Sequence, residues 1–217
     1  MSTSPVRRVI TRSGRGIRGK FPSRKMNGMV KWESVIEADA IRLFEFNVGV
    51  ASYHPQASEE VYHDASGAAR KFVPDFNVMW VQGGSVFIEV KSDADAAYPP
   101  TKRLLGFKAI AMQTQGKGYR ILTPSQIRLQ PRFDNLKLLE RHARCPLNAE
   151  EAQLLQSISR DMSYRIRDVG PTLGGEDVVF RALASGALRT DLNAPLNQES
   201  QVWHPDYREA GDGSFSI

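Results

Sequence analysis

Hydrophobic positions in the first part of the chain alternate between helical and strand spacing. Apolar residues recur every three to four positions over 32–45, 101–115 and 134–144, which predicts three helices. Short apolar runs between turn residues predict strands over 50–54, 61–63, 72–81, 85–91 and 119–122, with a loop over 93–100. The two longest strands flank Gln82-Gly83-Gly84, which is typical of a tight hairpin turn. This order predicts an α/β domain over 32–146, with a mixed sheet flanked by helices.

After residue 146 the pattern changes to shorter segments, and we predict a small second domain over 147–205. Asn148 is expected to cap a helix, because Glu151 follows three residues later in the spacing of a capping box. The further elements predicted here are helices over 161–167 and 176–185, the latter ended by Gly186, and a strand over 187–192. Three short helices and a strand resemble a small winged-helix unit. The polar residues 206–217 are predicted to form a loose tail.

Positive charge gathers at the amino end. The whole chain has a net charge of +5, but residues 1–31 hold nine basic residues and no acidic one, which leaves a net charge of −4 for the rest. We therefore predict a basic arm over 1–31 that neutralises the phosphates of nucleic acid. The residues expected to bind DNA are Arg7, Arg8, Arg12, Arg15, Arg18, Lys20, Arg24 and Lys25. The alternative is a solvated tail that only aids solubility.

The composition is that of an ordinary globular protein, with 41% hydrophobic and 24% charged residues. No apolar run approaches the roughly 20 residues that span a bilayer, so no membrane association is expected. The lone cysteine, Cys145, excludes an intramolecular disulfide and a cysteine-rich zinc site. These features predict a cytoplasmic protein.

Two acidic residues and a lysine fall on the two strongest predicted strands. Asp75 belongs to the first, and Glu89 and Lys91 share one face of the second because side chains alternate along a strand. Carboxylate oxygens are the ligands that Mg²⁺ prefers, and a lysine beside the ion can orient or deprotonate a bound water. The pattern therefore predicts metal-dependent hydrolysis of a phosphodiester. A surface salt bridge is the alternative, because so short a motif also arises by chance.

A third carboxylate is expected from the helix that precedes the sheet. Glu33 and Glu37 lie one turn apart there and share a face. Glu37 stands beside the apolar stripe of the helix, so we favour it as the ligand, with Glu33 second. Ser34-x-x-Glu37 also has the spacing of a capping box, in which Glu37 would only close the start of the helix.

The run from Lys20 to Lys91 resembles the N-terminal nuclease domain of TnsA, the endonuclease subunit of heteromeric bacterial transposases. The matching stretches are Phe21-Pro-Ser-Arg-Lys25, Trp32-Glu-Ser-Val-Ile-Glu37, Leu43-Phe-Glu-Phe46, Ser52-Tyr-His-Pro-Gln56, Pro74-Asp-Phe76 and Glu89-Val-Lys91, with a weaker match over 186–196. Gln115-x-x-x-Tyr119 resembles a motif from another branch of the same superfamily, and we interpret it as the end of a helix.

This resemblance implies a restriction-endonuclease-like core followed by a helical domain that binds DNA or a partner. It implies that Glu37, Asp75 and Lys91 are catalytic and that Glu89 ligates the metal, which would be Mg²⁺ with Mn²⁺ as a substitute. The implied reaction is cleavage of the 5′, non-transferred strand of double-stranded DNA at transposon ends. A DDE-type transposase would cut the other strand, and a regulatory ATPase would be a further partner.

Two other functions are compatible with the sequence. One is a stand-alone nuclease of the same type that acts in DNA repair or defence. The other is a non-catalytic DNA-binding module, although such a module gains nothing from carboxylates clustered towards phosphates.

Overall fold

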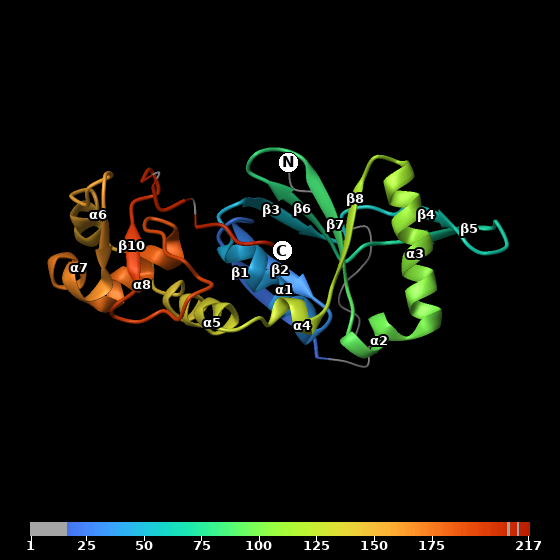
Figure 1. Cartoon of the computed structure of the whole chain (residues 1–217), viewed down its shortest axis with the longest axis horizontal. Coiled ribbons are helices and arrows are strands. Elements are labelled where there is room, and N and C mark those ends of the chain that lie inside the picture. Colours follow the sequence, from blue (N-terminus) through green and yellow to red (C-terminus); the bar gives the residue numbers. More distant parts are fainter. Residues whose placement is uncertain (1–16, 208, 212) are drawn as a thin grey trace. The chain divides into compact units, whose positions relative to one another are not determined.

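The computed structural model describes residues 17–207, 209–211 and 213–217 (Figure 1). Two compact units divide the chain: the first runs to Glu45 and resumes over 49–128, and the second combines 46–48 with 129–217. Of the predicted DNA-binding residues, Arg7, Arg8, Arg12 and Arg15 lie outside the described residues. None of the helices in the described part of the chain has the length and hydrophobicity to cross a membrane.

A four-stranded mixed sheet forms the centre of the first unit. Its strands are β3 (Val50–Pro55), β6 (Phe76–Trp80), β7 (Ser85–Val90) and β8 (Gly118–Leu122), in that spatial order. β6 pairs antiparallel with both β3 and β7, whereas β7 and β8 run parallel. The mixed sheet predicted from the sequence is therefore present.

Helices pack on both faces of this sheet. On one face α1 (Val35–Phe46) places Phe44 against Phe76, with the ring centroids 5.2 Å apart. On the other face α3 (Pro99–Thr114) buries Met112 in a cluster with Phe72 and Phe87. The two faces can both be apolar because neighbouring strand residues point to opposite sides of a sheet.

Residues that we assigned to the basic arm form a folded hairpin instead. Strands β1 (Gly19–Ser23) and β2 (Gly28–Trp32) pair antiparallel, with Phe21 opposite Val30. Both side chains are buried, at 4% and 5% exposed, so this hairpin belongs to the core of the first unit. The prediction of an arm over 1–31 is therefore wrong from Gly19 onward. The count of charges missed the hairpin because it does not consider the apolar residues between the basic ones.

Two other parts of the first unit differ from the predicted elements. The strand expected over 72–81 is divided, because Phe72 ends β5 (Ala69–Phe72), which pairs with β4 (Glu60–His63). The expected loop contains a short helix, α2 (Asp93–Ala97), whose start is capped by Ser92 accepting a hydrogen bond from the Asp95 N–H. A further short helix is α4 (Pro124–Ile127).

The second unit is mostly helical. Its elements are α5 (Arg132–His142), α6 (Ala149–Leu155), β9 (Ser163–Arg165), α7 (Ile166–Leu173), α8 (Glu176–Ser185) and β10 (Gln201–Trp203). The predicted cap of α6 is confirmed, because Asn148 and Glu151 bond reciprocally at 2.8 and 2.9 Å. The predicted end of α8 is also confirmed, because Gly186 adopts a left-handed conformation with φ 77°.

Long-range pairing overrides the other local predictions in this unit. The helix expected over 161–167 is wrong, because 163–165 form β9, which pairs antiparallel with β10. The strand expected over 187–192 is reduced to one isolated bridge, between Arg189 and Trp203.

The boundaries of the second unit also differ from the prediction. The unit begins at Leu129 rather than after residue 146, so it includes α5. The end of the chain is not a loose tail throughout, because Phe215 is buried at 8% exposed. Its carbonyl accepts a hydrogen bond from Asn47 Nδ2 at 2.6 Å, a contact that hydropathy alone does not reveal.

Candidate functional site

The register of β6 and β7 brings Asp75 and Glu89 together. Phe76 pairs with Ile88, so Asp75, one residue earlier, stands opposite Glu89 and on the same face. Asp75 Oδ2 accepts a hydrogen bond of 2.7 Å from the Val90 N–H, which ties the approach to β6 to the end of β7. Lys91 follows directly, and its Nζ lies 2.9 Å from Glu89 Oε1. The structure thus gathers Asp75, Glu89 and Lys91 at one end of this strand pair.

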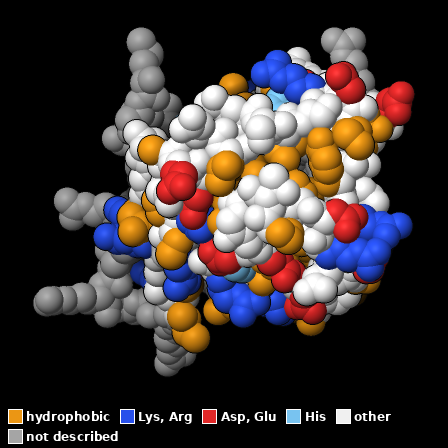
Figure 2. All heavy atoms as spheres, turned by 90° about the vertical axis from the view of Figure 1, so that its left-hand side faces the viewer, with side chains coloured by type: hydrophobic (Ala, Val, Ile, Leu, Met, Phe, Trp, Pro, Cys, Tyr) orange, Lys and Arg blue, Asp and Glu red, His pale blue; other side chains and the backbone are white. Residues whose placement is uncertain are grey.

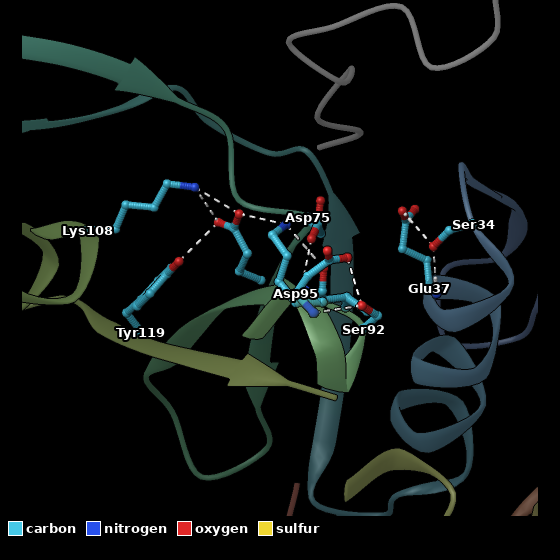
Figure 3. A network of polar contacts seen from close by, with 10 residues as sticks. Ser34, Glu37, Asp75, Ser92, Asp95, Lys108 and Tyr119 are labelled. Atoms are coloured by element: carbon cyan, nitrogen blue, oxygen red, sulfur yellow. Dashed lines mark hydrogen bonds and ion pairs between the residues drawn. The ribbon is translucent and has the colours of Figure 1, made fainter. Parts of the chain in front are cut away.

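Glu37 lies on the other side of Asp75 from Lys108 and Tyr119, in the first turn of α1 (Figure 3). Its carboxylate accepts hydrogen bonds from the Glu33 N–H at 2.8 Å and from Ser34 Oγ at 3.0 Å. These are contacts of a helix cap, so the capping role considered from the sequence is present. The charge of Glu37 nevertheless acts on the site, because it helps to raise the pKa of both Asp75 and Lys91. This favours Glu37 over Glu33 as the third carboxylate.

Asp75 is the most strongly perturbed acid of this group. Burial raises its pKa to about 7, and the negative charges of Glu89 and Glu37 act in the same direction. Lys91 and the Val90 N–H oppose this rise but do not cancel it. Burial likewise raises the pKa of Glu37. The two carboxylates therefore lie where an additional positive charge would stabilise them.

Glu89 has partners that we did not predict. Lys108 of α3 directs Nζ to both carboxylate oxygens, at 2.8 and 3.0 Å, and Tyr119 of β8 donates its hydroxyl at 3.0 Å (Figure 3). Glu89 is only 5% exposed. Burial opposes its ionisation, but Lys91 and Lys108 together hold its pKa below the usual value.

Both missed residues left a signal in the sequence. Lys108 lies between Leu105 and Met112 at spacings of three and four, which is the buried face of α3. A lysine at such a position requires a buried carboxylate partner. Tyr119 belongs to the motif that we interpreted as a helix end, and it starts the predicted strand over 119–122, which is present as β8, where Tyr119 pairs with Phe87.

The carboxylates of Asp75, Glu37 and Glu89 can be compared with the ligands that a divalent cation requires. Within the described residues, no group of three or more His, Cys, Asp and Glu side chains stands in a metal-ligating arrangement. Burial raises the pKa values of Asp75 and Glu37, which favours a cation beside them, but both oxygens of Glu37 already accept hydrogen bonds, from the Glu33 N–H and from Ser34 Oγ. Glu89 fits less well, because Lys91, Lys108 and Tyr119 already engage its two oxygens.

The described basic residues near the amino end divide into two kinds. Lys20 is exposed on β1, opposite the exposed Lys31 of β2, so both ammonium groups are accessible to a phosphate. Arg24 is also exposed, and Arg18 is partly buried.

Lys25, which we also predicted to bind DNA, has its ammonium bound to the backbone. Its Nζ donates hydrogen bonds to the carbonyls of Phe44 at 2.9 Å and Val50 at 2.6 Å. Burial lowers its pKa to about 8, although the charge of Glu45 opposes this. Lys25 therefore attaches the turn after β1 to the end of α1.

The second unit shows a mixed surface on the face seen in Figure 2. Lysine and arginine side chains lie there in separate groups, among acidic and hydrophobic ones. Elsewhere in this unit charges are paired, because Arg181 lies 2.6 Å from Glu151 and 2.8 Å from Asp177. This face therefore does not present one continuous basic surface.

Comparison of the chain with models of protein families finds no match, and comparison with curated proteins finds none either.

Proposed function

We propose that the first unit is a metal-dependent endonuclease that hydrolyses phosphodiester bonds of double-stranded DNA. The observation that carries the proposal is the meeting of Asp75, Glu89 and Lys91 at the ends of β6 and β7, with Glu37 beside them. A purely structural salt bridge does not need a second and third carboxylate at raised pKa next to the same lysine. A mixed sheet with helices on both faces supports the further assignment to the restriction-endonuclease-like fold.

Asp75 and Glu37 are the residues that would hold a divalent ion, Mg²⁺ or Mn²⁺. The ion supplies a bound water of lowered pKa and positive charge for the phosphate oxygens. Glu89 would hold Lys91 beside the ion, because Lys91 Nζ lies 2.9 Å from Glu89 Oε1. Burial opposes the charge of Lys91, but Glu89 and Asp75 raise its pKa above the usual value, so it stays an ammonium. On this proposal Lys91 orients the water and the phosphate as a donor rather than removing a proton.

The resemblance over 20–91 supports a more specific role in transposition. The chain would cut the 5′, non-transferred strand at transposon ends in the bacterial cytoplasm, together with a DDE-type transposase and a regulatory ATPase. Lys20 and Arg24 would contact phosphates, along with the basic residues before them. The second unit, with α6 to α8 and the β9–β10 pair, would be the winged-helix-like domain that binds DNA or a partner.

The test is cleavage of duplex DNA labelled separately on each strand, with Mg²⁺, with and without the transposase. We expect wild type to nick only the 5′ strand of transposon-end DNA, and to need the transposase to do so. Asp75→Asn should abolish cutting and leave DNA binding intact or tighter, because it removes a ligand and a negative charge near phosphate. The matched control is Glu59→Gln, which neutralises an exposed carboxylate of the same unit.

The other outcomes separate the alternatives. Efficient cutting of arbitrary duplex by the chain alone would favour the stand-alone nuclease of repair or defence. DNA binding without cutting of any substrate, with Mg²⁺ or Mn²⁺ and with the transposase, would favour the non-catalytic binding module.

A further inference from the structure

The carboxylate of Glu89 is held by donors from three elements. Oε1 lies 2.9 Å from the Nζ of Lys91 and accepts a hydrogen bond of 2.8 Å from the Nζ of Lys108. Oε2 accepts hydrogen bonds of 3.0 Å from Lys108 and from the hydroxyl of Tyr119 (Figure 3). A carboxylate offers about four positions to donors, so these contacts fill Glu89. Because Lys108 and Tyr119 fix Oε2, Oε1 is the oxygen that faces Lys91.

One aromatic ring supports both Lys108 and Tyr119, namely that of Phe72 at the end of β5. The Nζ of Lys108, a residue only 7% exposed, lies 4.7 Å from the centroid of this ring. The ring of Tyr119 stands at 88° to it, with the centroids 6.2 Å apart. An aromatic face stabilises a desolvated cation, and a perpendicular ring pair is a favoured arrangement. The two donors to Oε2 are therefore fixed parts of the interior.

Lys91 depends on Glu89 for its position. Its side chain is 30% exposed, and a lysine carries its charge at the end of a flexible stem. Its Nζ also contacts the carbonyl of its own neighbour Val90, at 3.2 Å. The contact with Glu89 is thus the one that connects this ammonium, through Lys108 and Tyr119, to α3 and β8.

We propose that Lys108 and Tyr119 are positioning residues for the hydrolysis of DNA: they orient the carboxylate of Glu89, which holds the ammonium of Lys91 where it acts on the water and the phosphate. The inference rests on the proposed function for the task of Lys91. It does not depend on how many metal ions bind or on which carboxylates bind them.

The variant Tyr119→Phe tests the inference most directly, because it keeps the ring on Phe72 and removes one donor to Glu89. With transposase, transposon-end DNA and Mg²⁺, kcat should fall by about tenfold to 100-fold, the scale of a slightly misplaced reacting group. KM should stay within about twofold, because the hydroxyl is directed at Glu89 rather than at DNA. The matched control is Tyr62→Phe, which removes the hydroxyl of another tyrosine that packs on Phe72 and should change neither constant.

A double variant shows whether Tyr119 acts through Lys91. If it does, Tyr119→Phe should slow the wild type but add less than about twofold to the loss caused by Lys91→Met, because the group that it positions is already absent. A general structural effect of Tyr119→Phe would instead slow both backgrounds by the same factor.

Lys108→Met should lower kcat at least as much as Tyr119→Phe, because Lys108 bonds to both oxygens of Glu89. Its control is Lys117→Met, which breaks a contact of 2.6 Å with Glu60, another buried glutamate of the first unit, and should leave cleavage unchanged. Thermal melting confirms that each variant is folded. If Lys108→Met does not fold, Lys108→Arg takes its place, because it keeps the charge and changes the geometry of the donor.

The position of Lys91 can also be observed without cleavage. Nuclear magnetic resonance of the ¹⁵N-labelled chain resolves the ammonium groups of lysines held in ion pairs, and the spectrum of Lys91→Met identifies the signal of Lys91. Tyr119→Phe should broaden or shift this signal, and Tyr62→Phe should leave it in place.

An unchanged kcat in Tyr119→Phe, a change confined to KM, or equal slowing of wild type and Lys91→Met would overturn the inference and leave the nuclease intact. If the wild type cuts no DNA under any of these conditions, the proposed function fails instead. The ammonium spectra then decide whether Lys108 and Tyr119 hold Lys91 in place, and an unchanged Lys91 signal in Tyr119→Phe would reject that role.

Discussion

The carboxylate of Asp75 accepts a hydrogen bond of 2.7 Å from the backbone N–H of Val90. A side chain just before one strand is thereby bound to the last residue of the neighbouring strand. Because Lys91 follows Val90 directly, this bond also limits the distance between Asp75, which we propose holds the metal, and Lys91, which we propose orients the water. The geometry of the site thus depends on backbone pairing rather than on flexible loops.

Asp75 should make the stability of the first unit depend on pH when no metal is present. Its pKa is about 7 in the folded chain and near 4 when unfolded, so the folded state binds more protons between these values. The free energy of unfolding should therefore fall as pH rises from 4 to 7, by up to about 4 kcal/mol from this group. Urea denaturation of wild type and Asp75→Asn across this range measures the difference. If the free energies of unfolding of wild type and Asp75→Asn changed with pH in the same way, the pKa of Asp75 would not be raised in the folded chain.

Substitution of Lys91 should weaken cleavage of DNA and leave metal binding intact. Lys91→Met removes an ammonium that lies 2.9 Å from Glu89 and that we propose acts on the water and phosphate. Cleavage should fall by about 100-fold or more, the usual scale for a positioned proton-transfer or orienting group. Mn²⁺ binding should persist, because lysine is not a metal ligand. Loss of Mn²⁺ together with cleavage would instead mean that Lys91 only maintains the structure of the site.

Glu45 should be essential for attaching the β1–β2 hairpin. Its buried carboxylate accepts hydrogen bonds from Ser23 Oγ at 2.6 Å, the Arg24 N–H at 2.8 Å and the Tyr53 hydroxyl at 2.7 Å. We expect Glu45→Leu to lower the free energy of unfolding by about 2–4 kcal/mol, because several buried donors lose their acceptor.

Urea denaturation measures this change, and Glu59→Gln serves as the control. Glu59 is exposed and pairs with the exposed Lys71 at 2.6 Å, so its loss should cost less than about 0.5 kcal/mol. Equal effects of the two substitutions would show that the hairpin does not depend on Glu45.

The basic residues before the hairpin should determine how strongly DNA binding depends on salt. Deleting residues 1–16 removes Arg7, Arg8, Arg12 and Arg15 and leaves β1 intact. The slope of log affinity against log salt should fall by about 0.9 for each phosphate contact that is lost. Fluorescence anisotropy with duplex DNA at several salt concentrations gives this slope. An unchanged slope would identify this segment as a solvated tail.

Local order in the sequence was enough to predict much of the site. Strand alternation puts Glu89 and Lys91 on one face, and the hairpin turn at Gly83-Gly84 returns the chain so that Asp75 comes alongside. Capping at Asn148 and the end of α8 at Gly186 were predictable for the same reason. Each of these features depends on residues close together in the chain, whose conformational preferences act before any packing.

Only the tertiary structure could decide the contacts made across long separations. Lys108 and Tyr119 reach Glu89 from α3 and β8, 19 and 30 residues further along the chain. Residues 163–165 are a strand only because 201–203 lie beside them, and their own sequence favoured a helix. Likewise, Lys25 is bound to the end of α1 rather than exposed. In each case the burial of apolar surface elsewhere selects the partner. The periodicity of α3 indicates that Lys108 is buried, but it does not indicate which carboxylate Lys108 contacts.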